Sequence, residues 1–216
     1  MDHVDEPNQR KFVSRGGLKL AHALDSFGLD VTGLTCADLG SSTGGFCDCL
    51  LQAGAAHVHS VDTAYGELAW TIRNDPRVTV MERTNALHAV PPGPVCELVT
   101  IDLGWTPQHL ALPAALPWLS TDGRVITLVK PHYEPIARDR GWLVDGVVAT
   151  DHARAIAEEI AGSVQQFGFT CLDQVASPVT GRKSGRRSSG GNTEFLLLLR
   201  ALQGSSDHRS GANENG

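Results

Sequence analysis

A carboxylate and a lysine each follow a short apolar run in the middle of the chain. Asp102 follows residues 99–101, and Lys130 follows residues 125–129 and precedes a proline. If these runs are neighbouring strands of a parallel sheet, both side chains lie over the crevice where open α/β sheets bind ligands. A lysine placed there can act as a base or stabilise negative charge, because burial and neighbouring charges shift its pKa. That chemistry suits a weakly acidic acceptor such as a ribose 2′-hydroxyl, which must lose its proton as it attacks.

Two further charged residues could complete this cluster. Lys19 lies in the first turns of an expected helix over 15–27, and Glu194 opens the final apolar run. Each has an ordinary alternative, since a helix lysine is usually solvated and a glutamate at a strand edge is usually a surface charge. The residues alone therefore favour a pairing of Asp102 with Lys130 and leave the other two open.

A glycine-rich turn follows the first apolar run, in the segment Asp38-Leu39-Gly40-Ser41-Ser42-Thr43-Gly44-Gly45-Phe46. Strand, glycine loop and helix in this order are typical of nucleotide sites in open α/β sheets. The G-x-x-x-G-G spacing differs from that of dinucleotide binders and suits S-adenosyl-L-methionine, which has no pyrophosphate. Asp62, at the end of the second run, would accept hydrogen bonds from ribose hydroxyls. Asn85 could meet the adenine edge, although a turn-forming asparagine explains it equally well.

The elements that position these residues alternate between short β-rich runs and longer helical stretches, which indicates βαβ units. We expect strands at 34–39, 57–62, 77–81, 97–102, 124–129, 169–175 and 193–200, and further helices at 44–54, 66–74, 107–119 and 151–167. Ser14 and Asp151 are the expected N-caps of the first and last helices. The prediction is an α/β fold with a seven-stranded, mostly parallel sheet and helices on both faces.

Composition limits the class of protein. The 216 residues are 41% apolar, enough for one core of single-domain size, and the net charge of -6 argues against nonspecific coating of nucleic acid. The chain has no apolar run of about 18 to 20 residues and starts with a polar segment, so we expect a soluble cytoplasmic protein without membrane association. Five scattered cysteines predict reduced, mostly buried thiols, and the spacing of Cys47 and Cys49 predicts no metal site.

Residues 11–202 are expected to form one domain. Residues 1–10 are expected to be a flexible N-terminus, and the Gly-, Ser- and Asn-rich residues 203–216 a disordered tail. Within the domain, residues 181–191 are expected to form a flexible basic loop.

Five motifs occur in order: Val13-Ser14-Arg15-Gly16-Gly17-Leu18-Lys19-Leu20, the glycine turn, Met81-Glu82-Arg83-Thr84-Asn85, Val129-Lys130-Pro131 and Asn192-Thr193-Glu194-Phe195. Together they resemble the TlyA (hemolysin A) family of FtsJ-like ribosomal RNA methyltransferases, over about residues 11 to 200. The resemblance implies a Rossmann-like fold and ribose 2′-O-methylation by a Lys-Asp-Lys-Glu tetrad at Lys19, Asp102, Lys130 and Glu194. It also implies S-adenosyl-L-methionine contacts at Asp38, Gly40, Ser41, Gly44, Gly45, Phe46, Asp62, Asn85 and Asp102. The implied partner is ribosomal RNA or a ribosomal subunit, and a monomer is favoured.

The sequence departs from the family in regions that bear on the substrate. Relatives carry a small RNA-binding domain before the Val13 motif, where this chain has about a dozen residues, so we expect docking to come from elsewhere. Basic residues available for it are Arg15 and, in the 181–191 loop, Arg182, Lys183, Arg186 and Arg187. The alternative is a mobile linker whose charges keep it solvated. Trp105 could stack on an unpaired base or belong to the core.

Other functions stay open at this point. A non-catalytic RNA- or ribosome-binding protein is conceivable, but it has little use for two carboxylates beside two lysines. A small-molecule methyltransferase is also possible, and testing which acceptors the protein methylates would distinguish it from an RNA methyltransferase. A membrane-active toxin lacks the amphipathic run that it would need.

Overall fold

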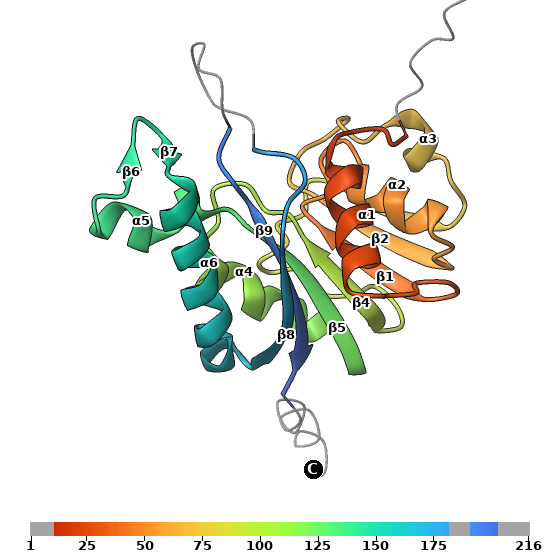
Figure 1. Ribbon diagram of the computed structural model, residues 1–216. Helices are drawn as coiled ribbons and strands as arrows, with labels where there is room; N and C mark the ends of the chain where they lie inside the picture. Colours follow the sequence, from red (N-terminus) through yellow and green to blue (C-terminus); the bar gives the residue numbers. More distant parts are fainter. Residues whose placement is uncertain (1–10, 182–190, 203–216) are drawn as a thin grey trace, which may run out of the picture.

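The computed structural model describes residues 11–181 and 191–202, and it is built on a seven-stranded sheet with the order β3-β2-β1-β4-β5-β9-β8 (Figure 1). Six of these strands run parallel, and β9 is antiparallel to both its neighbours. The sheet strands are β1 (Thr35–Leu39), β2 (His57–Val61), β3 (Val78–Met81), β4 (Cys96–Ile101), β5 (Leu119–Val129), β8 (Phe169–Ala176) and β9 (Phe195–Ala201). The predicted α/β architecture is confirmed.

Helices cover both faces of this sheet, because alternate strand residues are apolar on each side. In β1, Cys36 faces one core layer and Ala37 and Leu39 face the other. The first layer is covered by α1 (Gly16–Ser26), α2 (Gly45–Gln52) and α3 (Trp70–Arg73). The second is covered by α4 (Gln108–Ala111), η1 (Leu112–Trp118), α5 (Pro135–Asp139), α6 (Thr150–Ser163) and η3 (Val164–Phe167).

The described structure corrects several predicted boundaries. The helix expected over 66–74 is the single turn α3, and the one expected over 107–119 changes from α4 to the 3₁₀-helix η1, which contains Pro113 and Pro117. Strand β5 begins at Leu119, five residues earlier than expected.

Neither predicted N-cap residue occupies the N-cap position. Arg15 occupies the N-cap position of α1. The Ser14 hydroxyl, one residue earlier, still accepts a 3.3 Å hydrogen bond from the N–H of Gly16, the first residue of the helix. Ala149 precedes α6, so Asp151 lies in the first turn. A carboxylate there still favours the helix, because the N-terminal end of a helix carries partial positive charge.

The sequence prediction missed two elements after β5. One is the 3₁₀ turn η2 (Pro131–Tyr133), and the other is a hairpin of β6 (Leu143–Val144) and β7 (Val147–Val148) that forms a sheet of its own. Its turn residues Asp145 and Gly146 have φ angles of 48° and 76°, the left-handed conformation that tight hairpins require. The hairpin lies beside α5 and α6 (Figure 1).

All five cysteines are free, and four of them are buried, as predicted. Within the described ranges no helix is long and apolar enough to cross a membrane. The expectations for residues 1–10, 182–190 and 203–216 concern parts of the chain outside the described residues.

Candidate active site

A cavity of about 790 Å³ opens at the carboxyl ends of the parallel strands. This is where the strand order reverses between β1 and β4, the usual ligand position in such sheets. Its walls come from the start of α1, the glycine turn, the ends of β4 and β5, and the segment before β9. The volume is within the range of small-molecule and cofactor sites.

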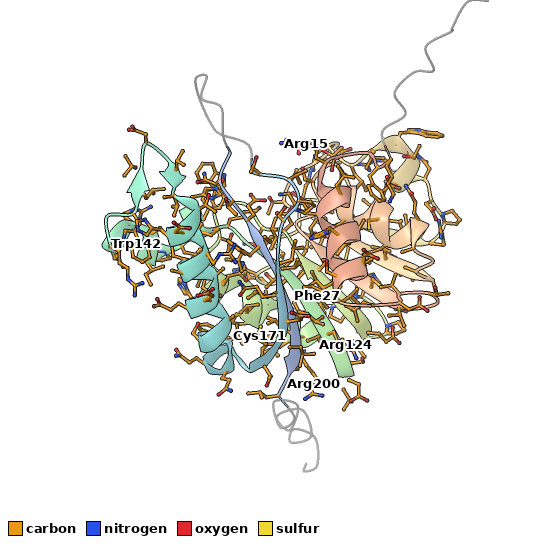
Figure 2. All side chains as sticks on the ribbon, in the orientation of Figure 1. Arg15, Phe27, Arg124, Trp142, Cys171 and Arg200 are labelled. Carbon is orange, nitrogen blue, oxygen red and sulfur yellow. The ribbon has the colours of Figure 1, made fainter. Side chains whose placement is uncertain are left out.

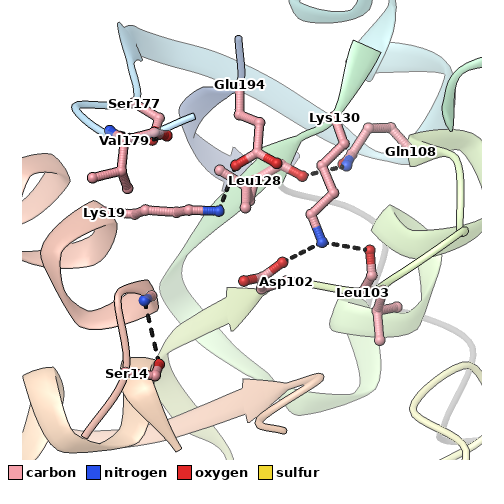
Figure 3. Close-up of polar contacts among 11 residues, drawn as sticks. Ser14, Lys19, Asp102, Leu103, Gln108, Leu128, Lys130, Ser177, Val179 and Glu194 are labelled. Atoms are coloured by element: carbon pink, nitrogen blue, oxygen red, sulfur yellow. Dashed lines mark hydrogen bonds and ion pairs between the residues drawn. The ribbon is translucent and has the colours of Figure 1, made fainter. Parts of the chain in front are cut away.

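Four charged side chains from distant segments line this cavity as two ion pairs (Figure 3). Lys19 of α1 pairs with Glu194, and Lys130 pairs with Asp102. The Lys130 ammonium also donates a 3.1 Å hydrogen bond to the Leu103 carbonyl. The structure therefore brings together all four residues of the expected tetrad, including the two that spacing alone left open.

The electrostatics of the cavity follow from its burial. The Glu194 side chain is only 3% exposed, and burial raises its pKa, while the nearby Lys19 and Lys130 charges oppose that rise. His132 also lines the cavity, and burial together with Lys130 and Lys19 lowers its pKa to about 4. At neutral pH the imidazole is therefore uncharged.

Asp38 lies at the floor of the cavity and is fully buried. Its carboxyl oxygens accept hydrogen bonds from the Cys47 thiol at 3.2 Å and the Thr100 hydroxyl at 3.0 Å. Burial raises the pKa of Asp38 to about 7, although these hydrogen bonds lower it. Asp38 thus ties β1 to both β4 and α2 beneath the glycine turn.

Two glycines allow the turn to approach its neighbours closely. Gly40 has a φ of 96°, and a side chain there would come within 2.7 Å of the Asp102 carbonyl oxygen. A side chain on Gly45 would come within 2.1 Å of the Ser14 hydroxyl, where α1 begins. Larger residues at these positions would push apart the walls that carry Asp102 and Lys19.

The other expected cofactor residues fall into two groups. Ser41 and Phe46 line the cavity with Gly40 and Gly45, and the Ser41 hydroxyl accepts a hydrogen bond from that of Ser60 at 2.8 Å. Gly44, Asp62 and Asn85 are not among the lining residues.

Asp62 and Asn85 both make turn contacts. The Asp62 carboxylate accepts hydrogen bonds from the Ser42 and Ala64 N–H groups, each at 2.7 Å. The Asn85 side-chain oxygen accepts one from the Leu87 N–H at 3.0 Å, which supports the turn explanation for that residue.

Trp105 is not a core residue, contrary to the core alternative. Its side chain is 76% exposed, and its backbone has a φ of 59°. The indole contacts Tyr133, which lines the cavity, with ring centroids 4.8 Å apart and the ring planes tilted by 31°. Trp105 therefore extends the cavity wall toward solvent.

The basic residues expected to bind RNA are only partly described. Arg15 is exposed and lines the cavity, at the opposite end of the molecule from Arg124 and Arg200 (Figure 2). Arg182, Lys183, Arg186 and Arg187 lie outside the described residues.

Several lining residues were not predicted from the sequence, among them His132, Tyr133 and Gly181. The first two directly follow Lys130-Pro131, so their closeness to the lysine was a usable signal. Gly181 gave no such signal, because its closeness to Glu194 arises only from the fold. A side chain at position 181 would come within 2.4 Å of the Glu194 carboxylate.

Comparison with known proteins adds to this geometry. Residues 12–189 match the model of the FtsJ-like methyltransferase family. The chain is 40% identical over 198 residues to the 16S/23S rRNA (cytidine-2'-O)-methyltransferase TlyA of Mycobacterium tuberculosis H37Rv, which covers 89% of this chain and 70% of that protein.

Solved structures agree with the fold. A hemolysin-like protein from Streptococcus thermophilus superposes with a TM-score of 0.81 at 34% identity, covering 92% of this chain and 70% of the other. An S-adenosylmethionine-dependent methyltransferase from Listeria monocytogenes gives a TM-score of 0.58 at 16% identity, covering 88% and 100%. These matches confirm the expected Rossmann-like methyltransferase fold.

Proposed function

Because the chain belongs to the FtsJ-like methyltransferase family, we propose that it methylates a ribose 2′-hydroxyl of ribosomal RNA with S-adenosyl-L-methionine. The observation that carries this proposal is the pair of lysine–carboxylate contacts lining one cavity with the glycine turn. The Mycobacterium tuberculosis relative is named as an rRNA (cytidine-2'-O)-methyltransferase, which supports the same acceptor. Neither a pure binding protein nor a small-molecule enzyme is favoured by a specific observation.

The residues present fit the cofactor. The cavity is large enough, and the backbone of Gly40, Ser41 and Gly45 together with the Phe46 ring forms one wall. Each Asp62 carboxylate oxygen accepts one backbone hydrogen bond, which leaves lone pairs for ribose hydroxyls. Gly44 gives the turn its left-handed φ of 95°, and Asn85 would contact adenine through its amide nitrogen. When bound, the cofactor supplies an electrophilic methyl group on a sulfonium.

The tetrad would activate the acceptor. Asp102 and the Leu103 carbonyl hold the Lys130 side chain, which would accept the 2′-hydroxyl proton as an amine or stabilise the developing oxyanion as an ammonium. Glu194 holds Lys19, which would position the ribose.

The outer rim would hold the RNA. The exposed Trp105 ring, which contacts Tyr133 with the ring planes tilted by 31°, offers a surface on which an unpaired base could lie, while Arg15 could contact a phosphate. We propose that Arg182, Lys183, Arg186 and Arg187 add salt-sensitive phosphate contacts, although these four lie outside the described residues.

The test is transfer of tritium from labelled S-adenosyl-L-methionine to ribosomal subunits and to naked ribosomal RNA. Wild-type protein is expected to label RNA, and the labelled nucleotide is expected to resist alkaline cleavage because its 2′-oxygen is methylated. Lys130→Ala should lower the rate roughly 10²- to 10⁴-fold. Arg200→Ala, a change at the opposite end of the sheet, is the matched control. Firm cofactor binding without label on any RNA would reject the proposal.

A further inference from the structure

Asn192 is a buried polar residue two positions before Glu194, in a segment without regular secondary structure. Its side-chain oxygen accepts a 2.9 Å hydrogen bond from the Val148 N–H, and its side-chain nitrogen donates a 2.9 Å hydrogen bond to the Gly146 carbonyl. Both partners belong to the β6–β7 hairpin. One short amide therefore joins the hairpin to the segment that carries Glu194.

Glu194 itself lies just outside β9, which begins at Phe195, so the sheet pairing ends before it. The segment is held instead by backbone hydrogen bonds from Ser177 N–H to the Glu194 carbonyl at 2.8 Å and from Gly181 N–H to the Asn192 carbonyl at 2.9 Å. On the other side, the described residues anchor the segment through the Asn192 amide and a 3.3 Å contact between the Thr193 and Thr150 hydroxyls. Asn192 is the buried member of that second group.

The hairpin gives this anchor a fixed partner. Its strands have two residues each, too few for stability on their own. It is braced by the stacking of Trp142 on His152 of α6, with ring centroids 4.2 Å apart and an interplanar angle of 6°. Asn192 thus joins the Glu194 segment to a hairpin that contacts α6 through the Trp142–His152 stack.

We propose that Asn192 is a positioning residue whose amide fixes Glu194, so that Glu194 holds Lys19 beside the Lys130–Asp102 pair. An asparagine suits this position because one side chain must offer both an acceptor and a donor. Aspartate offers only acceptors when ionised and would face the Gly146 carbonyl unfavourably. The catalytic consequence rests on the proposed function, whereas the effect on Lys19 does not.

The first experiment uses the cofactor-free protein and follows hydrogen exchange of the Lys19 ammonium by NMR, with the signal assigned through Lys19→Arg. Asn192→Ala is expected to speed this exchange at least about fivefold, because a displaced Glu194 no longer shields the ammonium. Asn74→Ala, which removes an exposed amide that donates a 2.7 Å hydrogen bond to the Trp70 carbonyl after α3, is expected to leave it unchanged. Wild-type exchange in Asn192→Ala would overturn the proposal whether or not the protein methylates RNA.

The second experiment measures methyl transfer. Asn192→Ala is expected to lower kcat about 10- to 100-fold while KM for RNA and for cofactor stays within about threefold, because the anchor affects the tetrad rather than binding. Asn192→Asp keeps the acceptor for Val148 and should lie between Ala and wild type; it takes over both measurements if Asn192→Ala does not fold. A kcat loss explained by the unfolded fraction, or wild-type kcat in a folded variant, overturns the proposal. Wild-type protein inactive on every RNA rejects the proposed function alone.

Discussion

The ion pairs around the cavity differ in kind from those on the outer surface. Lys19 and Glu194 are 175 positions apart in sequence, and their side chains are 12% and 3% exposed. On the outside of α6, Arg140 pairs with Glu159 at 2.9 Å while 42% and 50% exposed. Burial strengthens the first pair and also makes it costly to leave half complete, whereas water screens the second. The charges that the fold buries together are the ones that the proposed function uses.

The largest expected difference comes from neutralising one carboxylate in each pair. Glu194→Gln leaves the Lys19 charge buried and unmatched, so it should reduce the free energy of unfolding by about 3 kcal/mol. Glu159→Gln should change it by less than about 1 kcal/mol. Urea denaturation of both variants at pH 7 makes the comparison. Equal losses would show that the inner pair is no more desolvated than the outer one.

Two exposed tryptophans sharpen the contrast between the cavity rim and the rest of the surface. Trp105 is 76% exposed beside the cavity, and Trp70 is 75% exposed on α3. Trp105→Ala should weaken RNA binding by roughly 1–3 kcal/mol, the contribution of one stacked base, and leave cofactor binding unchanged. Trp70→Ala should have little effect on either. Fluorescence anisotropy with labelled RNA tests this, and equal weakening by both changes would contradict a specific role for the rim.

The smallest expected effect, taken per pH unit, is on the pH dependence of stability. Because burial raises the pKa of Asp38 to about 7, the folded state binds its proton more tightly than the unfolded state does. Its contribution to stability is therefore greatest at low pH and declines by about 1 kcal/mol per pH unit as pH rises from about 4 to about 7. Asp38→Asn should flatten the pH dependence of unfolding in this window, and the exposed Asp122→Asn should not. Parallel curves for Asp38→Asn and wild type would contradict the raised pKa.

The strands were predictable because those buried on both faces read as continuous apolar runs, as β4 and the end of β5 do. The β6–β7 hairpin was missed because two-residue strands leave no periodic pattern, although Asp145-Gly146 is a recognisable turn signal. The boundaries of the helix expected over 107–119 also differ from the prediction, because prolines change its second part into the 3₁₀-helix η1.

The site was only partly predictable. Asp102 and Lys130 end neighbouring parallel strands, so topology places them together. Nothing local links Lys19 to Glu194, and only the family resemblance related them. The Asn192 bridge could not have been inferred, since its partners are backbone groups, and the sequence does not indicate which side chain they contact.

The reversed direction of β9 affects how the protein folds. The last strand that the structure describes along the chain occupies an interior place in the sheet, between β5 and β8. Its first residues meet the carboxyl ends of the parallel strands, which is how Glu194 reaches the cavity. The tetrad therefore becomes complete only when this late strand inserts, and β8 gains its connection to the sheet in the same event. Catalytic competence and closure of the sheet should appear together during folding, as a single cooperative step.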